Sequence, residues 1–160
     1  MPRVYLDTSF VSACVTTRTD TPSLYRRELS REWWSSQGPR HERFVSAEVI
    51  AELSAPGYSQ GAEALGFIAE LPLLAIDEEV RGLAQVLIQE RVMPGPLAGD
   101  AIHVAVASWH AMDYLLSWNV RHLANPNKLV HLRTVCLRLG TVPPRILTPD
   151  ILWEIDDDQA

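Results

Sequence analysis

The sequence predicts an α/β fold in which a parallel sheet carries helices on both faces. Short apolar runs, typical of buried parallel strands, alternate along the chain with longer segments of helical periodicity. The first apolar run, Val4–Leu6, leads directly into Asp7, Thr8 and Ser9. No internal repeat and no internal domain boundary interrupts this alternation, so we expect one globular α/β domain.

In the first half of the chain, capping and breaking residues bound the expected helices. Asp20 or Thr21 can cap a helix that has Pro22 in its first turn, and Ser46 can cap the next helix along the chain. Gly and Pro pairs end these helices. The expected elements are, in order, Val4–Leu6, Thr8–Val15, Ser23–Gln37, Arg43–Val45, Ala47–Ser54, Gln60–Leu71 and Leu73–Ile76.

The second half continues the same alternation. Asp77 can cap a helix whose apolar residues keep helical spacing, and Gly140 can close the last helix. Between them lies the most apolar helix of the chain, in which Asp100 is the only acid. The expected elements are, in order, Glu78–Val92, Leu97–Met112, Tyr114–Ser117, Asn127–Leu139 and Arg145–Leu147.

Composition and charge limit the function classes. The chain has 160 residues, of which 47% are apolar and 21% charged, and no apolar run approaches the roughly 20 residues that a membrane span needs. We therefore expect a cytoplasmic protein with residues 1–150 as one domain and residues 151–160 as an acidic tail. Cys14 and Cys136 lie far apart and read as reduced, packed thiols. A net charge of −6 disfavours a protein whose whole surface binds nucleic acid.

Polar residues follow two of the expected strands. Asp7 and Asn119 lie at carboxyl ends of parallel strands, at the edge where ligands bind in open α/β sheets. Asp7 is equally well explained as the cap of the following helix. Asp113 precedes its strand, so it lies at the opposite edge, about 13 Å away, and is excluded from the candidate site.

Two further acids and a histidine are candidates. Asp100 is either the cap of its helix or a carboxylate directed at a cation, because a lone acid near the start of an apolar helix needs a partner. Considered by itself, Glu52 is predicted to lie on a solvent-exposed face of its helix. His103, one turn after Asp100, either bonds that acid, contacts a phosphate, or is satisfied locally.

The three acids suit one divalent cation if the fold brings them together. Asp7, Glu52 and Asp100 come from separate segments, and their mutual repulsion without a cation would be costly. Mg²⁺ prefers oxygen ligands, keeps several waters and uses one or two carboxylates directly. The convergence of these acids is a hypothesis that spacing in the sequence does not test.

Four motifs resemble those of PIN domains, in particular the VapC-type toxins of type II toxin–antitoxin pairs. In order along the chain they are Leu6-Asp7-Thr8-Ser9, Val49-Ile50-Ala51-Glu52-Leu53, Gly99-Asp100-Ala101-Ile102-His103-Val104-Ala105 and Leu115-Leu116-Ser117-Trp118-Asn119. The resemblance covers about residues 3–150. It implies a three-layer α/β/α sandwich with a mostly parallel central sheet.

The resemblance also implies an activity and partners. It implies an endoribonuclease dependent on Mg²⁺ or Mn²⁺, with Asp7, Glu52 and Asp100 as metal ligands, a homodimer, and an antitoxin protein as inhibitor. Asn119 stands where many PIN domains have Asp, which removes one negative charge from the site. Ser9, Ser117 and His103 are possible contacts for bound water or phosphate. Six arginines would either attract RNA to the site or only lie on solvent-exposed faces: Arg18, Arg26, Arg27, Arg31, Arg40 and Arg43.

Two other function classes remain open at this point. A catalytically weak or inactive PIN-fold module that binds RNA or protein would follow if Asn119 prevents turnover. A phosphatase with Asp7 as nucleophile is the third class, although Ser9 stands where such enzymes have a second acid.

Overall fold

A computed structural model describes residues 1–155 of the chain. Its centre is one five-stranded sheet with the strand order β3-β2-β1-β4-β5. Every neighbouring pair is parallel. The strands are β1 (Arg3–Leu6), β2 (Glu42–Ser46), β3 (Leu73–Leu74), β4 (Tyr114–Leu116) and β5 (Arg145–Leu147). The expected parallel sheet is confirmed.

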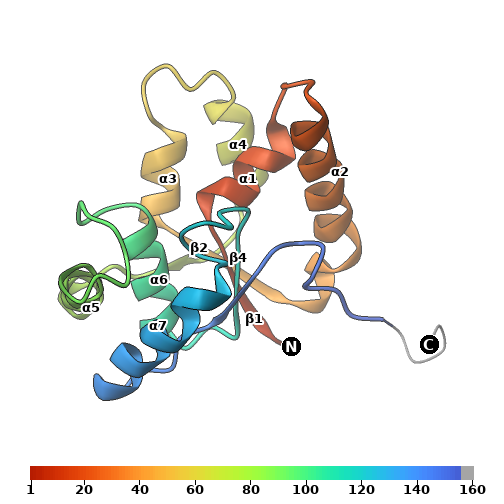
Figure 1. The fold of residues 1–160 in the computed structure, drawn as a ribbon. Coiled ribbons are helices and arrows are strands. Elements are labelled where there is room, and N and C mark those ends of the chain that lie inside the picture. The colour runs from red at the N-terminus through yellow and green to blue at the C-terminus, as the bar shows by residue number, and fades with distance from the viewer. Residues whose placement is uncertain (156–160) are drawn as a thin grey trace.

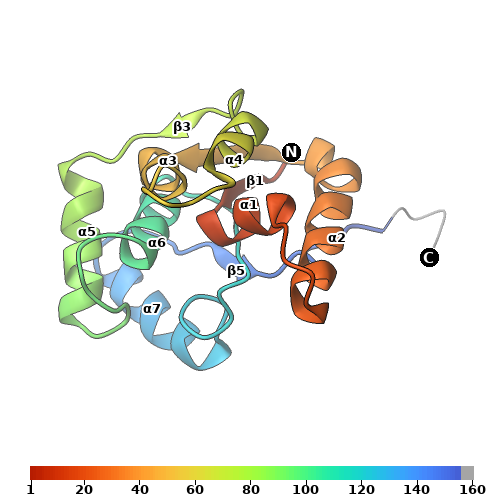
Figure 2. The same cartoon turned by 90° about the horizontal axis from the view of Figure 1, so that it is seen from above.

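Helices cover both faces of this sheet (Figure 2). The helices α5, α6 and α7 lie on one side, whereas α1 and α2 lie on the other. Figure 1 shows α3 and α4 rising above the edge at which β1 ends. The described helices are α1 (Thr8–Val15), α2 (Thr21–Ser36), α3 (Ala47–Leu53), α4 (Gly61–Phe67), α5 (Glu78–Gln89), α6 (Asp100–Trp109) and α7 (Pro126–Arg138). The three-layer α/β/α sandwich is thus the observed fold.

The strand order places a topological switch point beside β1. The chain passes from β1 outward to β2 and β3 on one side, and later returns to build β4 and β5 on the other. Leu6 pairs with Leu116 of β4, so the next row of the sheet begins with Asp7 beside Ser117. A crevice outside the carboxyl ends of the strands is the usual ligand position in such sheets.

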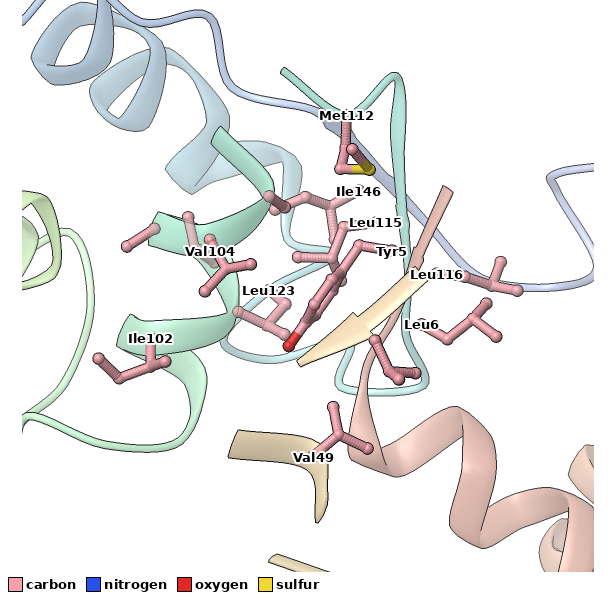
Figure 3. Close-up of a cluster of buried hydrophobic side chains, with 14 of the residues drawn as sticks. Tyr5, Leu6, Val49, Ile102, Val104, Met112, Leu115, Leu116, Leu123 and Ile146 are labelled. Carbon is pink, nitrogen blue, oxygen red and sulfur yellow. The ribbon is translucent and has the colours of Figure 1, made fainter. Parts of the chain in front are cut away.

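The core follows from the period-2 alternation of β1 and β4 (Figure 3). Tyr5 and Leu115 point toward α6, where they meet Val104, whereas Leu6 and Leu116 point to the opposite face. All five side chains are fully buried. The strands therefore read as continuous apolar runs, as a sheet covered on both faces requires.

Several element boundaries differ from the sequence prediction. The helix expected from Leu97 begins at Asp100 and ends at Trp109, because Gly99 (φ +60°) and Ala111 (φ +54°) leave the helical region. The third strand is reduced to Leu73–Leu74. Gly38–Arg40 forms a 3₁₀ turn, where the sequence predicted only the end of a helix.

The segment after residue 150 begins by packing on α2. The indole Nε1 of Trp33 donates to the carbonyl of Leu152 (2.8 Å), and the backbone N–H of Glu154 donates to Gln37 Oε1 (2.8 Å). Leu152 is thus buried at the start of the predicted acidic tail, whereas Glu154 and Ile155 are exposed. Residues 156–160 of that predicted tail lie outside the described residues.

Over residues 1–155, no helix combines the length and the apolar composition that crossing a bilayer would take.

We expect Leu115→Ala to lower the free energy of unfolding by about 2–5 kcal/mol, because it opens a cavity between β4 and α6. Urea titration followed by circular dichroism measures this change. Leu137→Ala is the matched control, since Leu137 is 51% exposed on α7 and its truncation should change stability by less than about 0.5 kcal/mol. Equal losses in the two variants would contradict the described packing.

Candidate functional site

Asp7 occupies the switch point directly after β1 and is only 2% exposed. Its Oδ1 accepts from the backbone N–H of Phe10 (3.1 Å) and from Ser9 Oγ (2.7 Å). Its Oδ2 accepts from Ser117 Oγ (2.6 Å). Asp7 therefore caps α1, as one interpretation of the sequence expected, and it lies at the carboxyl end of β1. Its role toward a ligand stays a prediction.

A chain of hydrogen bonds leads from Asp7 to Asp100. The backbone N–H of Asn119 donates to Ser117 Oγ (2.9 Å), and Asn119 Nδ2 donates to Asp100 Oδ2 (2.8 Å). The Asn119 carbonyl oxygen accepts from the backbone N–H of His122 (3.1 Å). The carbonyl oxygen of Asn119 is thus turned toward the backbone of the following turn, and the amide N–H₂ faces Asp100.

The start of α6 places Asp100 by backbone geometry. Gly99 is the N-cap and has φ +60°, and Asp100 is the first helical residue, so Asp100 is not the side-chain cap that one reading proposed. The N–H of Gly99 donates to Glu48 Oε1 of α3 (2.8 Å). Glu48 therefore ties the loop before Asp100 to the helix that carries Glu52.

His103 links the third acid to the sheet. Its Nε2 lies 2.5 Å from Glu52 Oε1, and its Nδ1 lies 2.6 Å from the hydroxyl of Tyr5. The Tyr5 hydroxyl also bonds Ser46 Oγ (2.7 Å), and Thr8 Oγ1 donates to Glu52 Oε1 (3.0 Å). Of the three alternatives for His103, the bond to Asp100 is not made, because Tyr5 and Glu52 engage the two ring nitrogens.

The charges of all three acids act on the imidazole of His103, and of the three only Glu52 is hydrogen-bonded to it. Burial acts to lower the pKa of His103, but the hydrogen bond to Glu52 and the charges of Asp7, Glu52 and Asp100 outweigh it and raise the pKa. Partial burial acts to raise the pKa of Glu52, yet its bonds to His103 and Thr8 hold it below the usual value. At neutral pH this pair is therefore biased toward the ionised state.

The pKa of Asp7 moves the other way. Burial raises it, and the His103 charge with the hydrogen bonds from Ser117, Ser9 and Phe10 offsets only part of that shift. A buried carboxyl with a raised pKa gains most from a nearby cation. The occupied, buried oxygens of Asp7 also disfavour the phosphatase reading, in which this carboxylate would attack a phosphate.

The three acids do not by themselves form a complete set of metal ligands. Within residues 1–155, no three His, Cys, Asp or Glu side chains are grouped closely enough to hold one metal ion together. Each acid is instead engaged by a different partner: Asp7 by hydroxyls, Glu52 by His103 and Asp100 by Asn119. Mg²⁺ bound directly by one or two carboxylates and otherwise by water suits this arrangement. The metal roles of the three acids stay predictions.

Asp113 lies where the sequence argument put it. Its carboxylate accepts from the backbone N–H of Arg3 (2.8 Å) at the start of β1, at the edge opposite Asp7. Sequence reasoning missed Tyr5, Thr8 and Glu48 as parts of the site. A tyrosine in a buried strand was the available signal, because its hydroxyl requires a partner.

Of three comparisons with known proteins, the comparison with solved structures finds similar folds. No family model matches the chain, and no curated protein matches it by sequence. The structure resembles VapBC2 from Rickettsia felis, bound to a DNA fragment from its promoter, with a TM-score of 0.55 and 16% identity over 78% of this chain and 93% of that one. It also resembles FitAcB from Neisseria gonorrhoeae, with a TM-score of 0.53 and 15% identity over 93% and 99% of the two chains. The fold is PIN-like.

The Glu52–His103 pair predicts a pH window of stability. Because the folded pKa of His103 is raised, its contribution to the free energy of unfolding is complete below about pH 6.5 and disappears as pH rises through the folded pKa. Because the folded pKa of Glu52 is lowered, the contribution of Glu52 is present above about pH 4.5. Glu52→Gln should therefore lower the free energy of unfolding most between pH 4.5 and 6.5, by on the order of 1 kcal/mol, since the carboxylate is 37% exposed.

Urea unfolding in EDTA at several pH values measures this difference. Glu63→Gln, at an exposed glutamate on α4, is the matched control and should shift stability equally at every pH. A loss in Glu52→Gln that grows above pH 8 would contradict the assigned pair.

Asn119→Asp is expected to have opposite effects with and without metal. In EDTA it should lower the free energy of unfolding by about 1–2 kcal/mol, because an amide donor to Asp100 becomes a like charge. In Mn²⁺ it should tighten binding, because the site gains a negative ligand. Calorimetric Mn²⁺ titration and thermal unfolding measure both, and unchanged stability in EDTA would contradict the amide's role.

Proposed function

We propose that this protein is a metal-dependent endoribonuclease that acts as the toxin of a toxin–antitoxin pair. The observation that carries the proposal is the hydrogen-bonded chain at the carboxyl edge of a PIN-like sheet, which runs from Asp7 through Ser117 and Asn119 to Asp100. Glu52 lies beside it, where Thr8 and the buried His103 hold its carboxylate. Acids from three separate segments at this edge support phosphodiester chemistry with a divalent cation that one or two of them bind directly.

Asp7 and Asp100 are the residues that would hold the cation, since the Ser117 and Asn119 bonds link them across the crevice. Bound Mg²⁺ or Mn²⁺ supplies an activated water and charge neutralisation at the phosphate. Ser117 and Ser9 fix both oxygens of Asp7, so its carboxylate enters the reaction without reorganisation. Asn119 similarly fixes Asp100.

Glu52 is the candidate proton acceptor. Its lowered pKa keeps it ionised, and its Oε1 is held by Thr8 and His103. His103 stabilises that ionised form and is itself fixed by Tyr5. In this proposal Glu52 removes a proton from the attacking water, and His103 is a positioning residue that sets the basicity of Glu52.

The structural neighbours support the toxin role, because VapBC2 and FitAcB are structures of toxin–antitoxin complexes. We extend to this chain an antitoxin protein as partner, RNA as substrate and a homodimer as the assembly. The antitoxin is the best supported of the three, because both neighbours are such complexes.

A binding module without turnover is the second candidate function. The observation that favours it is Asn119, whose amide neutralises no cation and occupies one oxygen of Asp100. The same fold and crevice would then bind RNA or a protein partner without cleaving it.

Cleavage of a labelled RNA in Mg²⁺ or Mn²⁺ tests the proposal. Asp7→Asn should lower the cleavage rate at least about a hundredfold, because the lost charge is worth several kcal/mol in the transition state. Asp113→Asn is the matched control and should keep the wild-type rate, since Asp113 lies at the opposite edge. EDTA should abolish cleavage by both the wild type and Asp113→Asn.

Two outcomes would count against the nuclease. Equal cleavage by Asp7→Asn and Asp113→Asn would show a contaminating activity, and RNA binding with no metal-dependent cleavage would favour the binding module.

A further inference from the structure

Beside the acidic site lies a groove of about 550 Å³, which we call the α1–α2 groove. Its walls come from the end of α1, the loop before α2, the first turns of α2, the α3–α4 loop and the residues after β4. Figure 1 shows the α1–α2 and α3–α4 loops rising on the same side, above the end of β1. The volume lies within the range of ligand pockets in proteins.

The groove is continuous with the candidate site. Ser9 and Asn119 line it and also take part in the hydrogen bonds that hold Asp7 and Asp100. The backbone N–H of Trp118 donates to Ser9 Oγ (2.9 Å), and Trp118 forms part of the groove wall. A polymer lying in the groove would therefore pass directly to the acids.

The lining has the chemistry of a nucleic-acid site. Six side chains carry hydroxyl groups and two carry guanidinium groups, whereas no carboxylate lines the groove. In a chain of net charge −6, this is a local surface that favours anions. Hydroxyl and guanidinium groups are the usual partners of phosphate and sugar oxygens.

Arg26 is the guanidinium best placed for a phosphate. It lies over the ring of Trp118, 5.5 Å from the centroid, and within the described chain it forms no ion pair. Trp118 is fixed in turn, because its Nε1 donates to Ser30 Oγ (2.7 Å) and Tyr25 packs edge-on against it. Arg18 is less available, since it pairs with Asp20 (3.4 Å).

Tyr58 supplies the aromatic surface on the opposite wall. It is half-buried on the α3–α4 loop, and among residues 1–155 no other aromatic ring packs against it. The buried Trp118 ring is already covered by Tyr25 and Arg26. A base entering the groove would therefore stack on Tyr58 rather than on Trp118.

We propose that the α1–α2 groove binds the single-stranded RNA next to the cleaved phosphate, with Arg26 on a phosphate and Tyr58 stacked on a base. This inference rests on the proposed nuclease function and adds to it a substrate subsite. Arg26 and Tyr58 contact the nucleotide flanking the reaction, so they set affinity and base preference rather than the chemical step.

Fluorescence anisotropy with a labelled RNA of about 12 nucleotides, in EDTA to prevent cleavage, tests the phosphate contact. Arg26→Gln should weaken binding about tenfold and reduce the salt dependence by about one charge. Arg27→Gln is the matched control, since Arg27 lies next to it on α2 but outside the groove lining, and its affinity should stay within about twofold of the wild type.

The stacking contact has its own pair of variants. Tyr58→Ala should weaken RNA binding about tenfold, and Tyr58→Phe should restore it, because the ring and not the hydroxyl carries the contact. Photo-crosslinking with 4-thiouridine should attach the RNA to the α3–α4 loop in the wild type. Thermal unfolding of each variant confirms that it is folded.

Several results would overturn the inference. These are equal affinities for Arg26→Gln and Arg27→Gln, a Tyr58→Phe affinity as weak as that of Tyr58→Ala, or Arg26-dependent binding of a poly-glutamate peptide in place of RNA. The last result would assign the groove to an acidic protein partner.

Failure of the inference and failure of the proposed function are distinguishable. If the wild type cleaves RNA in a metal-dependent way but Arg26→Gln binds RNA as tightly as the wild type, only the groove proposal is rejected. Arg26-dependent RNA binding without metal-dependent cleavage would retain the groove and reject the nuclease.

Discussion

The buried imidazole of His103 is the contact on which the rest of the site depends. It joins the sheet through Tyr5 and joins α3 through Glu52, while its own helix begins at Asp100. Each acid has its own hydrogen-bond partner: Ser117 for Asp7, His103 for Glu52 and Asn119 for Asp100. The protein therefore stabilises the three carboxylates separately, and His103 does so with the group whose pKa is raised.

The hydrogen-bond partners place the acids in different surroundings. Asp7 is buried, has a raised pKa and is held by two hydroxyls, whereas Glu52 is partly exposed, has a lowered pKa and is held by His103. Acids in such different surroundings suit different tasks, with Asp7 as the group that gains most from a cation and Glu52 as an ionised base. Asn119 supports this division, because its amide fixes Asp100 without adding a fourth charge.

The distribution of charge explains how an acidic protein can bind an anionic polymer. The net charge of −6 opposes binding over the whole surface, and the acids at the switch point oppose it at the reaction centre. The α1–α2 groove contains arginines and hydroxyls but no carboxylate, and it opens beside those acids. Attraction in the groove and repulsion around it would restrict RNA to one path, with screening by salt weakening both effects.

The parallel sheet and the order of strands and helices along the chain could be predicted from the amino-acid sequence, because apolar periodicity is a local property. The edge on which Asp7, Asn119 and Asp113 lie could be predicted too, because it depends only on whether a residue precedes or follows its strand. The contacts between side chains required the folded structure: His103 bonds Glu52 and not Asp100, and Asn119 turns its amide toward Asp100. These contacts join residues about 20 to 100 positions apart, and side-chain direction there depends on how helices pack on the sheet.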